Sequence, residues 1–180
     1  MVDPVSRRAA RLAALIALPV ALVAGFVTFR VLAPGGSASG DGAAPGGGAT
    51  TAVDVAAPSL APRTATVCRA LLAKLPATLG DLTRRPVTAG AEQNAAYGDP
   101  PVTVACGSTG PAPPPDPQLF AINGICWYAE DGKDARTWVL QGREVPLVVR
   151  VPTAYTGQNL VDLSTPIRNA VAEVAQVCRG

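Results

Sequence analysis

Four cysteines are the residues of this chain with the clearest chemistry. Cys68, Cys106, Cys126 and Cys178 are widely spaced, and the nearest two are about twenty residues apart. Zinc sites and thioredoxin-like redox sites use close pairs such as Cys-x-x-Cys, and this chain has none. An even number of widely spaced cysteines in an oxidising compartment predicts structural disulfides, and four cysteines allow three pairings.

Histidine is absent from the whole sequence. Its absence excludes Ser-His-Asp and Cys-His nucleophilic sites, and it removes the commonest metal ligand. The chain also lacks the Gly-rich motifs that bind phosphates and dinucleotides. We therefore expect no cofactor and no metal, and any enzyme of this sequence would have to rely on carboxylates or on a Ser-Lys pair.

The pair Arg84-Arg85 is the one basic doublet beyond the N-terminal region. Its ordinary interpretation is a solvated loop. The alternative is a small anion-binding site, because the arginine fork matches carboxylate and phosphate groups. The net charge of the chain is +2, but residues 64–180 carry ten basic and ten acidic side chains. A nucleic-acid binder would show a basic patch on its folded part, so we expect no nucleic-acid partner.

The N-terminal segment predicts the compartment. Leu12–Phe29 is an uncharged apolar run that follows three arginines, and with the next four residues it matches a hydrocarbon core of about 30 Å. Positive charge stays cytoplasmic. We therefore predict a cytoplasmic basic stub over 1–11, a single transmembrane anchor over 12–33, and an extracytoplasmic remainder at the cell membrane. The alternative is a cleaved signal peptide and a secreted protein.

Composition divides the rest of the chain into a linker and one domain. Residues 34–63 are mostly Gly, Ala, Pro, Ser and Thr, without an aromatic residue, and such a segment buries too little apolar area to order itself. We predict a disordered linker there. Residues 64–180 have the length of one small domain.

Apolar periodicity and turn residues predict the elements of that domain. We expect a helix over 66–75, mostly loop over 80–101, strands over 102–106, 119–129, 137–140 and 145–151, and a helix over 167–178. Apolar residues on both faces of 119–129 indicate a central strand, and Pro146 places its strand at an edge. The expected fold class is α+β, a two-layer domain with a roughly four-stranded antiparallel sheet and two helices on one face.

These elements suggest one of the three disulfide pairings. Cys68 and Cys178 lie on the apolar sides of the two expected helices, and Cys106 and Cys126 lie on apolar strand faces. We therefore predict the pairs Cys68–Cys178 and Cys106–Cys126.

The aromatic residues leave two interpretations open. Tyr97, Trp127, Tyr128 and Trp138 would form a contact surface if they were exposed. The alternative is that they pack in the core, because tryptophan and tyrosine bring a large apolar area.

Three segments carry a resemblance to a known family. They are Cys68–Val87 (CRALLAKLPATLGDLTRRPV), Ala95–Gly107 (AAYGDPPVTVACG) and Ile122–Tyr128 (INGICWY). Together they give a Cys- and Leu-rich helix, a double arginine, an aromatic-Gly-Asp-Pro turn, a strand ending in Cys-Gly, and an Asn-Gly-x-x-Trp strand. This pattern resembles an actinobacterial family of membrane-anchored or secreted proteins of unknown function. Cys126 stands where many members carry an acidic residue, so the disulfide pairing here can differ from theirs.

The resemblance supports the address and a shared fold but implies no activity. The leading hypothesis is a membrane-anchored extracytoplasmic envelope protein that acts as a binding module for another envelope protein, a cell-wall component or a small molecule. One alternative is a histidine-independent enzyme that acts on envelope material. A second is an accessory subunit of a membrane complex.

Overall fold

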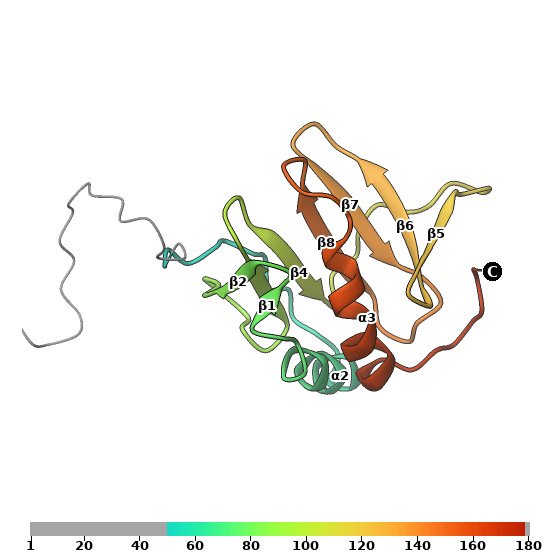
Figure 1. Ribbon diagram of the computed structural model, residues 1–180. Coiled ribbons are helices and arrows are strands. Elements are labelled where there is room, and N and C mark those ends of the chain that lie inside the picture. The colour runs from blue at the N-terminus through green and yellow to red at the C-terminus, as the bar shows by residue number, and fades with distance from the viewer. Residues whose placement is uncertain (1–49, 179–180) are drawn as a thin grey trace, which may run out of the picture. The chain divides into compact units, whose positions relative to one another are not determined.

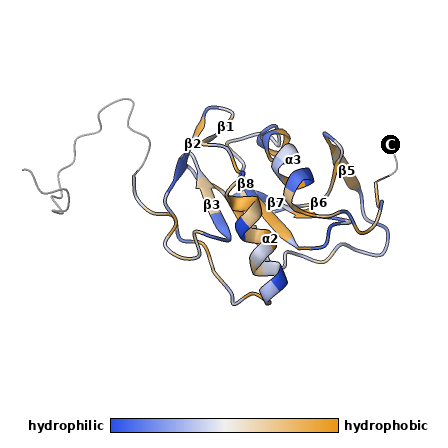
Figure 2. Ribbon diagram, turned by 90° about the horizontal axis from the view of Figure 1, so that it is seen from below, coloured by the Kyte–Doolittle hydropathy of each residue, from blue (hydrophilic) through white to orange (hydrophobic). Residues whose placement is uncertain are grey.

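The computed structural model of the protein describes residues 50–178. Eight strands form one antiparallel sheet in the order β1-β2-β3-β4-β8-β7-β6-β5 (Figure 1). Their bounds are β1 Thr78–Leu79, β2 Leu82–Arg85, β3 Asn94–Tyr97, β4 Val102–Cys106, β5 Leu119–Ile122, β6 Ile125–Asp131, β7 Ala135–Leu140 and β8 Leu147–Pro152. Two helices, α2 (Pro62–Leu72) and α3 (Asn159–Ala170), lie on the same side of the sheet and contact each other (Figure 2).

The core lies between this helix pair and one face of the sheet. Cross-strand neighbours bring apolar side chains together across the central strands, as where Val149 on β8 stands opposite both Val104 on β4 and Trp138 on β7. Further along the sheet, Trp127 stands between Leu140 and Phe120. Antiparallel pairs of this kind are the unit from which a sheet gains packing energy, and they determine which face the helices cover.

A second, smaller cluster covers part of the opposite face. All four residues of β3 are buried, because the segment before α2 packs over its outer side. There Val53 and Val55 contact Ala96, and Val53 forms an isolated parallel bridge with Val87. The buried Asn94 side chain donates hydrogen bonds to the carbonyl oxygens of Ala56 (3.1 Å) and Ala89 (3.2 Å). We call residues 50–60 the N-terminal strap.

The strap corrects the prediction of a linker over 34–63. Residues 34–49 lie outside the described residues, but 50–63 are packed against the sheet or belong to α2. Composition alone could not predict this order, because the strap is held by contacts with the sheet and not by its own residues. Its backbone bonds to Pro86 and Thr88 exist only once the sheet has formed.

The prediction of a roughly four-stranded sheet is also wrong. One reason is that a β-hairpin was interpreted as a single strand. The expected strand over 119–129 is two strands, β5 and β6, joined at Asn123-Gly124. Both turn residues have positive φ, 46° and 77°, which is the geometry of a two-residue hairpin that Asn-Gly favours. The turn explains why apolar residues seemed to fall on both faces of a single strand.

The region 80–101, predicted to be mostly loop, supplies two further strands, β2 and β3, and β1 lies immediately before it. These strands are too short to show an alternation of apolar and polar residues. They are stabilised by pairing with neighbouring strands. The prediction that Pro146 places its strand at a sheet edge is also wrong. Pro146 precedes β8 rather than lying in it, and β8 runs between β4 and β7, away from either edge.

The last helix begins and ends earlier than predicted. It spans Asn159–Ala170 with Pro166 inside it, whereas the predicted range was 167–178. Leu160, Leu163 and Ile167 form its buried stripe. Residues 171–178 then run without helix along the end of the sheet, and we call them the C-terminal strap.

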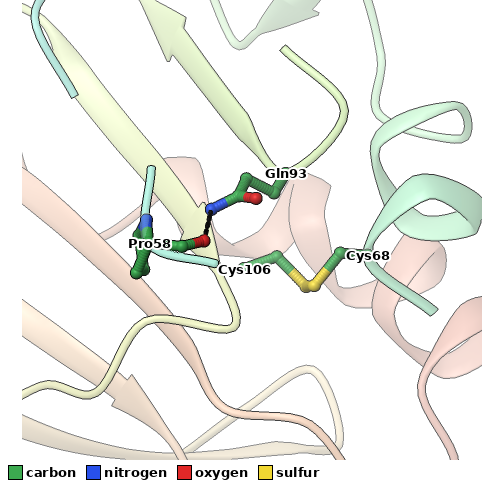
Figure 3. Close-up of a disulfide and its surroundings, with 4 residues drawn as sticks. All are labelled: Pro58, Cys68, Gln93 and Cys106. Atoms are coloured by element: carbon green, nitrogen blue, oxygen red, sulfur yellow. Dashed lines mark hydrogen bonds between the residues drawn. A yellow bond between two sulfur atoms is a disulfide. The ribbon is translucent and has the colours of Figure 1, made fainter. Parts of the chain in front are cut away.

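All four cysteines form disulfides, as predicted, but the predicted pairing is wrong. The pairs are Cys68–Cys106 and Cys126–Cys178. Cys68 on α2 faces the end of β4, where Cys106 lies; close by, the Gln93 side chain donates to the Pro58 carbonyl (Figure 3). Because α3 ends at Ala170, Cys178 is carried away from the helix pair to the start of β6.

None of the helices within residues 50–178 is long and apolar enough to cross a bilayer. The basic stub and the anchor predicted over 1–33 lie outside these residues.

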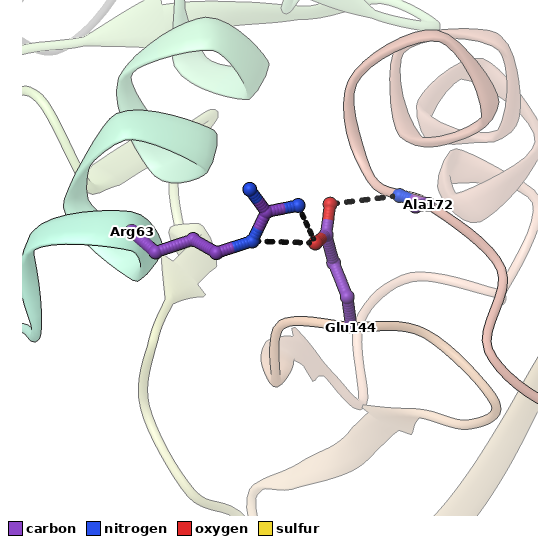
Figure 4. Close-up of polar contacts among 3 residues, drawn as sticks. All are labelled: Arg63, Glu144 and Ala172. Atoms are coloured by element: carbon purple, nitrogen blue, oxygen red, sulfur yellow. Dashed lines mark hydrogen bonds and ion pairs between the residues drawn. The ribbon is translucent and has the colours of Figure 1, made fainter.

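Glu144 ties the start of α2 to the C-terminal strap (Figure 4). Its carboxylate accepts hydrogen bonds from the Arg63 guanidinium, at 2.7 Å from Nη2, and from the Ala172 N–H at 3.2 Å. The Arg63 hydrogen bond, helped by the Ala172 N–H, lowers the pKa of Glu144 below its ordinary value of 4.5.

This lowered pKa predicts an acid-dependent loss of stability. A carboxylate whose pKa is lower in the folded state stabilises the fold above its unfolded pKa, and this contribution is lost as the pH falls through the folded pKa. Between about pH 6 and pH 3, the Tm of Glu144→Gln should therefore fall less than that of the parent, as followed by circular dichroism. Glu92→Gln, at an exposed position, is the control and should keep the parental acid dependence. Equal slopes for all three proteins would contradict the assignment.

Candidate functional site

A cavity of about 660 Å³ lies beside strand β2. It is lined by β2, by the turn after β3 and by the loop between β8 and α3. The lining residues with charged or hydroxyl-bearing side chains are Asp81, Thr83, Arg84, Arg85, Asp99 and Tyr155. The strap contributes Thr50 to the same wall.

The predicted arginine pair reaches this cavity, but its two members do different things. Arg84 stands opposite Tyr97 and Arg85 opposite Ala96 on β3. Successive strand residues point to opposite faces, and Tyr97 belongs to the main core whereas Ala96 belongs to the cluster under the N-terminal strap. The two guanidinium groups therefore leave β2 on opposite sides and cannot act as one fork.

Arg85 is a structural clamp. Its side chain is only 9% exposed. Nη1 donates to the Gly98 carbonyl and Nη2 to the Thr51 carbonyl, both at 2.9 Å, and Nη1 lies 3.4 Å from an Asp99 carboxylate oxygen. One buried arginine thus joins the strap, the turn after β3 and an acidic side chain. Its buried Nε has no partner within the described part of the chain.

Arg84 is the arginine of this pair whose charge is not compensated by a described acidic residue. It is half-buried, and it forms no ion pair with any residue in 50–178. Burial raises the pKa of the neighbouring Tyr97 hydroxyl, and the Arg84 charge opposes this shift. Arg84 is the cross-strand neighbour of Tyr97 on β3, and the Tyr97 hydroxyl donates to the Pro76 carbonyl at 2.9 Å.

The predicted aromatic contact surface does not form. Tyr97 and Trp127 are fully buried and Trp138 is 4% exposed, so the core interpretation of these three residues is correct. Tyr128 is half-buried, and its hydroxyl donates to Glu130 at 3.4 Å.

The cavity also holds two carboxylates, at Asp81 and Asp99. Asp99 forms an ion pair with Arg85. Asp81 and Asp99 therefore have different surroundings and are not a symmetric pair of catalytic carboxylates. The described residues hold no cluster of three or more metal-ligating side chains.

Sequence reasoning missed Asp81 and Tyr155 as site residues. Tyr155 lies in the loop after β8, and its backbone N–H donates to the Pro152 carbonyl at 3.0 Å. The available signal was weak: a single aromatic residue in the polar stretch Thr-Ala-Tyr-Thr-Gly. Only the return of this loop toward β2 brings the ring to the cavity.

Fold and site define a small disulfide-bonded α+β domain with a cavity at one side of its sheet. The chain belongs to the family described as "Protein of unknown function (DUF3515)", which matches residues 16–176. This agrees with the resemblance to a family without an assigned activity. No curated protein and no solved structure matches the chain.

The clamp predicts that arginine is required at position 85. Lysine keeps the charge but cannot donate to two separate carbonyls through a planar fork, so Arg85→Lys should lower the free energy of unfolding by about 1–2 kcal/mol. Amide exchange at Val53 and Thr88, whose N–H groups join the strap to the residues after β2, should speed up. Exposed Arg150→Lys should change neither quantity. Unchanged exchange at these amides in Arg85→Lys would show that the strap does not depend on the clamp.

Proposed function

We propose that this protein is an extracytoplasmic envelope protein whose folded domain binds a small anionic ligand in the cavity beside β2. The observation that carries the proposal is Arg84, a half-buried guanidinium in a cavity of about 660 Å³ without an ion-pair partner in the described residues. Charge-assisted hydrogen bonds from arginine to carboxylate or phosphate are roughly twice as strong as neutral ones.

The surroundings of Arg84 favour binding over a purely structural role. Its neighbour Arg85 spends its donors on backbone carbonyls and Asp99, so Arg84 is the group left to meet an anion. Tyr155, from the loop between β8 and α3, is a hydroxyl-bearing residue in the same cavity lining, and such groups orient a bound molecule. A volume of this size suits a small molecule rather than a protein surface.

The proposed location has two supports. Two disulfides in one small domain are typical of oxidising compartments. The apolar N-terminal run and its arginines, which precede the described residues, are the pattern of an export signal or a membrane anchor.

The enzyme alternative is weaker on the present geometry. Catalysis by two carboxylates requires one group to donate a proton while the other acts as base or nucleophile. Of the two in this cavity, Asp99 is ion-paired at 3.4 Å with Arg85. We therefore place ligand binding ahead of catalysis.

The ligand proposal is tested with inorganic phosphate and succinate as probes. Either anion should shift the amide resonances of β2 and raise the Tm of the full chain in proportion to its occupancy. Arg84→Gln should weaken binding of the probe about tenfold or more, because it removes one charged hydrogen-bond donor. Arg150→Gln is the matched control, since Arg150 is also a strand arginine but is exposed. Binding of neither probe, or equal binding to Arg84→Gln and the parent, would contradict the proposal.

The location is tested by fusing a reporter after residue 180. A reporter enzyme that is active only outside the cytoplasm should be active, and the same fusion without residues 1–33 should be silent. A reporter that functions only in the cytosol should show the reverse pattern. Cytosolic activity of the intact fusion would remove the proposed envelope role.

A further inference from the structure

The two disulfides differ in their access to solvent. Both members of Cys68–Cys106 are 0% exposed, and their bond runs from α2 to the end of β4 near Pro58 and Gln93 (Figure 3). Cys126 is 8% exposed, and Cys178 is half-buried. Thiol–disulfide exchange requires a thiolate to reach a sulfur atom, so the second bond is the accessible one.

The surroundings of Cys126–Cys178 leave room for an attacking group. A cavity of about 270 Å³ is lined by both cysteines. Gln141, Arg143 and Gln176 share its wall. Cys178 is the more exposed of the two residues, so we expect the attack at its sulfur.

The C-terminal strap is held to the fold in two separate ways. Its first part is fastened by hydrogen bonds, because Val174 and Ala175 donate to the Gly142 carbonyl at 2.9 and 3.2 Å and Glu144 N–H donates to the Ala172 carbonyl at 3.0 Å. Residues 176–178 form no hydrogen bond with any other described residue. The covalent bond to Cys126 is therefore their main attachment.

We propose that Cys126–Cys178 is a site of thiol–disulfide exchange for an extracytoplasmic dithiol reductant. A thiolate of the dithiol attacks the sulfur of Cys178, the Cys126–Cys178 bond breaks, and Cys126 leaves as a thiolate that takes up a proton. The second thiol of the reductant then attacks the mixed disulfide. Cys178 is released as a thiol, and the reductant becomes a disulfide. Two electrons pass from the dithiol to the cysteine pair.

Reduction at this site releases residues 176–178 and leaves the domain folded. The helix pair and the sheet remain joined by Cys68–Cys106, and the last fully buried residue before the break is Val171. The cavity beside Gln141 and Arg143 then loses the wall that Gln176, Val177 and Cys178 provide.

The test compares the reduction rates of the two bonds in the full chain. The native protein is treated with dithiothreitol, quenched with N-ethylmaleimide and mapped by peptide mass spectrometry. Cys126 and Cys178 should become alkylated at least about tenfold faster than Cys68 and Cys106. Equal rates, or faster reduction of Cys68–Cys106, would overturn the proposal.

Two further measurements separate native exchange from unfolding. Low concentrations of urea should leave the rate at Cys126–Cys178 unchanged and accelerate that at Cys68–Cys106, because only the buried bond needs an opening of the fold. The double variant Cys126→Ser/Cys178→Ser should keep the parental circular dichroism and cooperative unfolding. A urea-dependent rate at Cys126–Cys178, or loss of the fold in this variant, would show that the bond belongs to the core.

Discussion

The disulfide between Cys68 and Cys106 fixes helix α2 against the end of β4, close to the middle of the sheet. With α2 in place, α3 packs beside it and the main core closes between the helix pair and one sheet face. The chain before α2 is then directed over the other face of β3 and β4, where Val53 and Val55 become buried. This bond thus joins the helix layer to the sheet, and the strap is held on the other face by its own contacts. In the chain-entropy account, closing a loop of 38 residues is worth about 4 kcal/mol.

The candidate site depends on the same arrangement. The first residue of the N-terminal strap, Thr50, lines the cavity, and Arg85 donates to the next residue through the Thr51 carbonyl. Arg85 donates its hydrogen bonds to groups of the fold itself. Its neighbour Arg84 forms no ion pair with a described residue and can therefore bind an anionic ligand. The proposed ligand site is therefore a consequence of alternation along one short strand. The second disulfide lies at the opposite end of the sheet order, on β6, and the proposed exchange reaction there is independent of this site.

Local patterns predicted those elements that carry their own signal. The strands predicted over 102–106, 137–140 and 145–151 correspond to β4, β7 and β8, and the helix predicted over 66–75 overlaps α2. Errors arose where a pattern had two interpretations. Asn123-Gly124 was included in a single predicted strand, and the last helix was predicted over 167–178 although α3 spans Asn159–Ala170. The short strands β1 and β2 carry too few residues for periodicity to show. Of the cavity residues, only the arginine pair drew attention.

The sequence by itself determined that the domain is mixed α and β, that its four cysteines form disulfides, and that histidine chemistry is absent. It also placed the chain in its family. Only the tertiary structure decided which cysteines pair, that the sheet has eight strands, and that Arg84 and Arg85 serve different purposes. Composition and periodicity are properties of neighbours along the chain. Pairing, burial and charge compensation depend instead on residues that are far apart in the sequence. The disulfide partners are 38 and 52 positions apart, and such partners meet only when the fold closes.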